Sequence, residues 1–197
     1  MPKQKAGRLE VITGGMFSGK TEELLRRLER VRIAGKGFVL LKPATDNRYG
    51  KRKVATHYGR QFDALVLDPG LETLCTLQSL VGKEELERVS VVAFDEGNFF
   101  SDQFPELCES LVTLGKRVIV AGLDLTFAAK PFGPMPDLMA LADEVVKLHA
   151  VCVRCGGVAS RSQRLINGKP APLDGPIIQV GGLERYEARC RDCYKCK

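Results

Sequence analysis

Residues 14–21 read Gly-Gly-Met-Phe-Ser-Gly-Lys-Thr and fit the phosphate-binding pattern G-x-x-x-x-G-K-[ST] without a gap. The glycines let the backbone curl so that its amides point at phosphate oxygens. Lys20 can then reach the β- and γ-phosphates, and the Thr21 hydroxyl can ligate Mg²⁺. An ordinary glycine turn is the alternative, so the segments on either side of the pattern decide between the two interpretations.

Both flanks favour the phosphate-binding loop. Residues 9–13 form a short β-rich run, and a helical pattern follows the loop. Strand, loop and helix are the context that the motif requires, and they place the positive end of the helix dipole at the phosphates. The sequence therefore predicts an α/β fold of the P-loop NTPase type. One face of the helix is apolar and the other is charged. The apolar face consists of Leu24, Leu25, Leu28 and Val31, and the charged face consists of Glu22, Glu23, Arg26, Arg27, Glu29 and Arg30.

Alternating apolar runs and helical patterns extend this prediction to a mainly parallel sheet with flanking helices. Strands are predicted at residues 38–41, 64–67, 89–94, 117–124 and 144–150, and helices near 71–78, 105–114 and 136–142. Leu107, Cys108, Leu111 and Leu114 are the expected buried positions of the second of these helices, and Cys75 is likewise expected in the core.

The apolar run at residues 89–94 ends in two acids, Asp95 and Glu96. A buried strand that terminates in an acid is the Walker B arrangement, in which that acid lies on the Mg²⁺ side of the nucleotide. Asp95 is therefore the predicted metal-side acid. A second carboxylate beside it is placed to act on the nucleophile, although a helix-entry charge is the alternative for Glu96.

Two loops follow predicted strands and so belong near the carboxyl edge of the sheet, where ligands bind in open α/β folds. Residues 42–52 are polar and turn-rich, and Arg48 in this loop is either functional or a solvated charge. Residues 125–133 carry Phe127 and Phe132 between glycine and proline residues. These rings form either the aromatic wall of a pocket or a satellite hydrophobic cluster, and the residues alone leave both open.

The seven cysteines include two spaced pairs, Cys152 with Cys155 and Cys190 with Cys193. In a chain with no secretory signal, such pairs favour a metal over disulfides or redox thiols. Four thiolates around Zn²⁺ leave no open position, so the zinc would be structural. The intervening residues 156–189 exceed the usual ribbon spacing of about 15–20, which indicates a zinc ribbon with an extended loop. We expect a nucleotide-binding domain at 1–150 and a small zinc-ribbon domain at 151–197.

Composition excludes some classes of protein. No run of about 18 apolar residues exists, so no transmembrane helix is expected, and the polar first residues lack the core of a signal peptide. A cytoplasmic enzyme is the expectation. The net charge of +6 is spread along the chain and interleaved with acids. No basic patch with interleaved aromatic residues appears, so neither a nucleic-acid partner nor a membrane partner is predicted.

Seven ordered motifs together resemble the type II thymidine kinases. They are Gly-x-Met-Phe-Ser-Gly-Lys-Thr, Lys-Pro-x-x-Asp-x-Arg-Tyr, Asp-Glu-Gly-x-Phe-Phe, Gly-Leu-Asp, Lys-Pro-Phe-Gly, the two cysteine pairs and Gly-Gly-x-x-x-Tyr. The resemblance runs from about residue 9 to residue 193. It implies ATP-dependent phosphorylation of the 5′-hydroxyl of thymidine or deoxyuridine, with Mg²⁺ and a structural zinc. It also implies a homotetramer and feedback inhibition by thymidine triphosphate.

The same resemblance assigns roles to individual residues, with Glu96 as the general base and residues 177–182 as a lasso whose backbone holds the thymine ring. Cys152, Cys155, Cys190 and Cys193 would bind zinc, and Thr21 and Asp95 would lie on the magnesium side. ATP would be bound by Gly14, Gly15, Met16, Phe17, Ser18, Gly19, Lys20, Thr21, Arg48 and Asp95, with Asp46 in the same loop as Arg48. The nucleoside would contact Met16, Leu123, Phe127, Phe132, Ser162, Ile177, Ile178, Gln179, Val180, Gly181 and Tyr186.

One position departs from the family pattern: Asn98 stands where the family commonly has glutamine. A nucleic-acid-stimulated P-loop ATPase with a zinc ribbon is the alternative function, and a kinase of another deoxynucleoside is a third. Nucleoside-dependent ATP turnover distinguishes the kinase from the ATPase.

Overall fold

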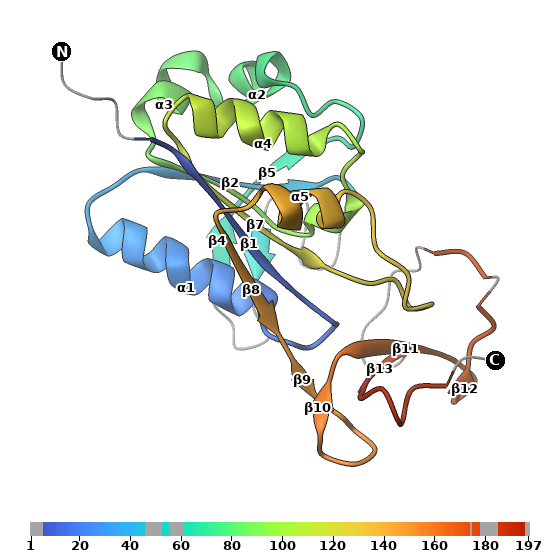
Figure 1. Cartoon of the computed structure of the whole chain (residues 1–197). Coiled ribbons are helices and arrows are strands. Elements are labelled where there is room, and N and C mark those ends of the chain that lie inside the picture. Colours follow the sequence, from blue (N-terminus) through green and yellow to red (C-terminus); the bar gives the residue numbers. More distant parts are fainter. Residues whose placement is uncertain (1–5, 46–52, 56–60, 174, 178–184, 196–197) are drawn as a thin grey trace.

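The computed structural model describes residues 6–45, 53–55, 61–173, 175–177 and 185–195. Among these, no helix has the length and apolar character needed to cross a membrane. The elements follow the predicted alternation of strands and helices through the first three quarters of the chain, and shorter strands make up the rest (Figure 1).

The centre of the fold is a six-stranded sheet in the order β5-β2-β6-β7-β1-β8. Every neighbouring pair in it is parallel. The predicted P-loop-type sheet is therefore confirmed. Its strands are β1 (Arg8–Gly14), β2 (Phe38–Pro43), β5 (Leu65–Leu67), β6 (Val91–Phe94), β7 (Arg117–Leu123) and β8 (Glu144–Leu148).

Helices cover both faces of the sheet, with α1 on one face and the other α-helices on the opposite face (Figure 1). Alternate residues of a strand point to opposite faces. Leu9 and Val11 of β1 therefore pack in one core cluster with Leu107, whereas Ile12 packs in the other with Leu24. The helices are α1 (Lys20–Ile33), α2 (Leu74–Val81), α3 (Lys83–Arg88), the 3₁₀ turn η1 (Gly97–Phe99), α4 (Phe104–Thr113) and α5 (Met135–Leu141).

Three expectations about burial and element ends were wrong. Cys75 is exposed, because α2 turns only Leu77 fully into the core. Leu114 is 44% exposed, because α4 ends at Thr113 and Leu114 is its C-cap. The strand expected at residues 144–150 ends at 148, and the next residues already belong to another sheet.

The sequence did not predict several further strands, most of which have only two or three residues, too few to show a periodic pattern. One antiparallel pair lies between β2 and β5 in the chain, and the others form the C-terminal module beyond the end of β8 (Figure 1). They are β3 (Lys53–Ala55), β4 (Gln61–Asp63), β9 (Ala150–Val151), β10 (Val158–Ala159), β11 (Arg161–Ile166), β12 (Lys169–Pro170) and β13 (Tyr186–Arg189).

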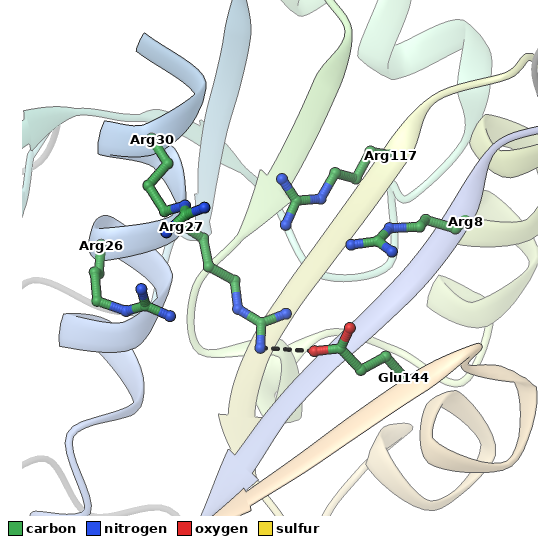
Figure 2. A pocket seen from close by; sticks show the side chains of 6 residues that line it. All are labelled: Arg8, Arg26, Arg27, Arg30, Arg117 and Glu144. Carbon is green, nitrogen blue, oxygen red and sulfur yellow. Dashed lines mark hydrogen bonds and ion pairs between the residues drawn. The ribbon is translucent and has the colours of Figure 1, made fainter. Parts of the chain in front are cut away.

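A buried ion network fastens α1 to the sheet, and it corrects one further prediction. Arg27, expected on the solvent face, is only 8% exposed. It donates hydrogen bonds to the fully buried Glu10 carboxylate at 2.5 Å and to Glu144 at 2.9 Å. Arg117 binds the same Glu10 carboxylate through two nitrogens, and Arg8 also pairs with it. In Figure 2 Arg27 reaches from α1 toward Glu144, and Arg8 and Arg117 extend from the strands.

The pocket that these arginines line, about 200 Å³ in volume, lies where β1 and β7 begin and so at the opposite edge from the phosphate-binding loop (Figure 2). Burial alone would raise the pKa of Glu10, but hydrogen bonds and charge from Arg117 and Arg27 outweigh it and lower that pKa below 4.5. The ionised carboxylate is therefore part of what holds α1 in place.

We expect Glu10→Gln to lower the free energy of unfolding at pH 7 by about 2–4 kcal/mol, because it leaves buried guanidinium groups with one carboxylate fewer. A group with a lowered folded pKa stabilises above its unfolded pKa and loses that effect as the pH falls through the folded value. Urea unfolding should therefore show the difference from wild type narrowing below about pH 4.5. Glu85→Gln, which removes the exposed partner of Arg88, should change stability by less than about 1 kcal/mol. An equal decrease in the free energy of unfolding in Glu10→Gln and Glu85→Gln would contradict the prediction.

Candidate active site and metal centre

Described residues predicted to bind ATP, to act as the base and to contact the nucleoside gather at one edge of the sheet. The phosphate-binding loop follows β1, Asp95 and Glu96 follow β6, and Leu123 ends β7. Strands β6, β7 and β1 are consecutive and parallel in the sheet, so their carboxyl ends meet. This edge is where an open α/β sheet binds its ligand.

The backbone of the loop requires its first glycine. Gly14 has φ 142°, and a Cβ there would lie 2.2 Å from the carbonyl oxygen of Leu148. The loop then passes into α1, and the unpaired amides of a helix N-terminus are suited to bind a phosphate. Lys20 Nζ donates to the carbonyl oxygen of Gly15 at 2.7 Å, which places the ammonium group against the loop that would enclose the phosphates.

Thr21 and Asp95 bring a hydroxyl and a carboxylate together. Thr21 Oγ1 lies 3.3 Å from Oδ1 and 3.2 Å from Oδ2 of Asp95, and Asp95 is only 4% exposed. Hard oxygen ligands of this kind suit Mg²⁺, which is held by one or two protein groups together with substrate phosphates. The two residues therefore fit the predicted magnesium side of the site.

Glu96 has a strained backbone. Its φ of 53° and ψ of 41° lie in the left-handed region, which a non-glycine residue adopts at a cost of about 1–3 kcal/mol. The residue is 8% exposed and follows Asp95 directly at the carboxyl end of β6. Strained residues that the surrounding structure holds in place cluster at active sites. The geometry is consistent with the predicted catalytic position.

Asn98, the departure from the family pattern, has a defined contact. Its Oδ1 accepts a hydrogen bond from the backbone N–H of Leu123 at 2.8 Å, so the shorter amide ties η1 to the end of β7. Within the described part of the chain its buried Nδ2 has no hydrogen-bond partner. The side chain thus positions the segment after Glu96.

The loop after β7 holds its two phenylalanines differently. Phe127 is 5% exposed, and its carbonyl oxygen accepts a hydrogen bond from the Tyr194 hydroxyl at 2.5 Å. Phe132 is half-buried and meets Phe99 edge to face, with 5.5 Å between ring centroids. Phe127 is therefore held by the C-terminal module, and Phe132 keeps a surface that a ligand can contact.

The C-terminal module reaches the phosphate-binding loop through Ser162 on β11. Its Oγ accepts a hydrogen bond from the backbone N–H of Met16 at 2.9 Å. Tyr186, on the neighbouring strand β13, is 6% exposed, whereas Ile177 is 58% exposed. The remaining predicted contacts, Asp46, Arg48, Ile178, Gln179, Val180 and Gly181, lie outside the described residues.

The four predicted zinc ligands converge. The sulfur atoms of Cys152, Cys155, Cys190 and Cys193 all lie within 4.8 Å of one another. The Sγ atoms of Cys155 and Cys190 are 3.7 Å apart, close to the roughly 3.8 Å that four Zn–S bonds of about 2.3 Å give in a tetrahedron. The donor set and its spacing both fit a structural zinc ion.

The thiols of this cluster differ in acidity. A hydrogen bond from the Cys190 backbone lowers the pKa of Cys152 to about 6. Hydrogen bonds with the Cys190 and Cys155 thiols raise the pKa of Cys193 to about 12. Four neighbouring thiols cannot all ionise at neutral pH by themselves, whereas a divalent metal deprotonates the sulfurs that bind it.

Sequence reasoning missed two links between the site and the cysteine cluster. The Phe17 side chain, in the phosphate-binding loop, packs against the hydrophobic cluster that contains Cys152 and Ala188. Arg164 of β11 lies over the Phe127 ring. Neither contact has a spacing signal, because each joins residues far apart in the chain.

This fold and site define a P-loop protein of the nucleotide-binding class that carries a cysteine cluster suited to zinc. The sequence profile described as thymidine kinase matches residues 7–194. The chain belongs to the thymidine kinase family, which confirms the resemblance seen in its motifs.

The similarity to individual relatives extends over nearly the whole chain. A thymidine kinase of Coprothermobacter proteolyticus is 53% identical over 93% of this chain and 88% of its own. One of Chloroflexus aurantiacus is 50% identical over 96% and 95%, and one of Halobacterium salinarum is 48% identical over 96% and 94%. Among solved structures, a genome-packaging NTPase of Sulfolobus turreted icosahedral virus 2 covers 73% of this chain and 75% of its own at 11% identity. Its TM-score with this chain is 0.46.

Proposed function

We propose that this protein transfers the γ-phosphoryl group of ATP to the 5′-hydroxyl of thymidine or deoxyuridine and forms the monophosphate. The observation that supports this most is membership of the thymidine kinase family over residues 7–194. The close pair of Thr21 and Asp95 beside a phosphate-binding loop agrees with it. The alternative, a nucleic-acid-stimulated ATPase, has no comparable support.

In this proposal the protein supplies position and charge, which phosphoryl transfer mainly requires. The loop amides and Lys20 hold the ATP phosphates, and Thr21 and Asp95 hold Mg²⁺, which neutralises phosphate charge when bound. Glu96 accepts the proton of the attacking hydroxyl. The resemblance to the family assigns Arg48 the role of adding positive charge near the phosphates.

The nucleoside is assigned to the space between the phosphate-binding loop, the loop after β7 and the C-terminal module. Ser162 hydrogen-bonds the phosphate-binding loop and Tyr194 hydrogen-bonds the loop after β7, so the C-terminal module joins both loops, and a nucleoside bound there would lie beside all three segments. Residues 177–182 are proposed to hold the base. The division into a nucleotide-binding domain at 1–150 and a zinc-ribbon domain at 151–197 and the cytoplasmic location remain proposals that rest on the sequence. The homotetramer and the feedback inhibition by thymidine triphosphate remain proposals that rest on the resemblance.

The test is a phosphoryl-transfer assay with ATP and Mg²⁺ that compares thymidine, deoxyuridine, deoxycytidine and no acceptor. We expect thymidine monophosphate to form, deoxycytidine to be inert, and turnover to stop when Mg²⁺ is chelated. Lys20→Ala, purified in the same way, controls for contaminating kinases and should be inactive. ATP hydrolysis that is independent of nucleoside, or that single-stranded DNA stimulates, would overturn the proposal.

A further inference from the structure

Arg164 is a buried cation that none of the proposed catalytic steps uses. It lies in the middle of β11 and is 1% exposed. Within the described part of the chain it forms no ion pair, and its buried Nε has no hydrogen-bond partner. A buried charge without a counterion is costly, and apolar residues commonly fill such places at least as stably. An unsatisfied buried donor in a folded protein therefore calls for an explanation.

The contacts of Arg164 explain its position. Its guanidinium carbon lies 3.5 Å from the centroid of the Phe127 ring, a cation–π arrangement. Its Nη1 donates to the carbonyl oxygen of Pro176 at 2.5 Å. Arg164 is paired across the sheet with Tyr186 and hydrogen-bonds its side chain. One planar group thus touches three segments that are far apart in the chain.

The chain at Gly175 packs directly on this guanidinium group. A Cβ on Gly175 would lie 2.4 Å from Nη2 of Arg164, so a larger residue would displace one or the other. The backbone nearby is fastened to the same strand. The carbonyl oxygen of Arg164 accepts from Ala171 N–H at 2.9 Å, and Leu165 N–H donates to the Arg185 carbonyl oxygen at 2.7 Å. The two ends of the segment from 171 to 185 are therefore held at neighbouring residues of β11.

We propose that Arg164 is a positioning residue for nucleoside binding, which holds the chain at Pro176 in a fixed place beside Phe127. Because arginine offers a planar fork and a face that stacks on aromatic rings, it makes both contacts at once, which lysine cannot do. This inference rests on the proposed function, in which Phe127, Tyr186 and the residues after Pro176 contact the nucleoside. Arg164 itself takes no part in phosphoryl transfer.

The experiment compares Arg164→Met and Arg164→Lys with Arg161→Met as the matched control. Arg161 lies on the same strand, and within the described residues its side-chain hydrogen bonds go only to the adjacent Ser160. We expect Arg164→Met to raise KM for thymidine about 10–100-fold, the effect of losing one or two hydrogen bonds to a charged group. KM for ATP should stay within about threefold, and Arg164→Lys should recover part of the loss. The control should resemble wild type.

Three outcomes would overturn this inference. One is an unchanged KM for thymidine in a folded Arg164→Met. Another is an equal rise in both KM values with a lower Tm, which indicates a purely structural role. The third is failure of both Arg164 variants to fold. Thymidine affinity measured by calorimetry supplies a readout that does not depend on turnover. If wild type and Arg161→Met fail to phosphorylate thymidine, it is the proposed function that fails.

Discussion

Glu96→Gln is expected to lower kcat for thymidine phosphorylation by about 10²–10⁴, the usual contribution of a general base. Glutamine keeps the shape of the side chain and loses the ability to accept a proton. The residue does not belong to the phosphate-binding loop, so the affinity for ATP should change little. A variant that retains binding and loses turnover has lost an interaction made in the transition state.

The measurement is single-turnover formation of thymidine monophosphate, with ATP affinity determined separately by calorimetry. Glu106→Gln serves as the matched control, because Glu106 is an exposed carboxylate on α4 that none of the proposed steps uses. The strained backbone at Glu96 is formed by the main chain and should survive the substitution, so both variants should unfold at similar temperatures. Unchanged turnover in a folded Glu96→Gln would remove this residue from the role of base.

The parts of the site that the sequence predicted are those in which chemistry constrains neighbouring residues. A phosphate-binding loop needs glycines, Lys20 and Thr21 at fixed spacings, and a Walker B acid must follow a buried strand. The order of strands and helices was predictable for the same reason, because an apolar strand or a one-sided helix has a visible period. The convergence of the cysteine pairs followed from their spacing and residue type.

The parts that were missed depend on contacts between distant residues. Arg27 looked like a solvent-facing charge, because its helical position says nothing about a carboxylate at Glu10 on the sheet beneath. The available signal was Glu10 itself, a charged residue within an otherwise apolar run, which indicates a buried partner of opposite charge. Arg164 lies in a strand whose polar residues show no alternating pattern, and the residues it contacts are distant in sequence. Periodicity reports which face is buried, and it does not identify the partners of a buried charge.

Removal of zinc is expected to weaken thymidine binding about 10–100-fold before ATP binding changes by more than a few fold. The reason lies in how the second cysteine pair is connected. Arg189 donates to the carbonyl oxygen of Cys193 at 3.2 Å, and the adjacent Tyr194 holds the Phe127 carbonyl. Without a cation, crowded thiols that differ in acidity no longer hold the two pairs together. The loop at Phe127 then loses its anchor.

The phosphate-binding loop depends much less on this cluster, since it is formed by β1 and α1. Within the described part of the chain it meets the cysteine cluster through the Phe17 side chain and β11 through Ser162. Cys155→Ser should reproduce the effect of chelation, whereas Cys75→Ser, at an exposed position on α2, should leave both affinities unchanged. Calorimetric titrations with thymidine and with a non-hydrolysable ATP analogue, before and after chelation, separate the two sites. If the zinc-free protein bound thymidine normally, or lost both ligands in parallel, the cluster would not be the anchor of the nucleoside site.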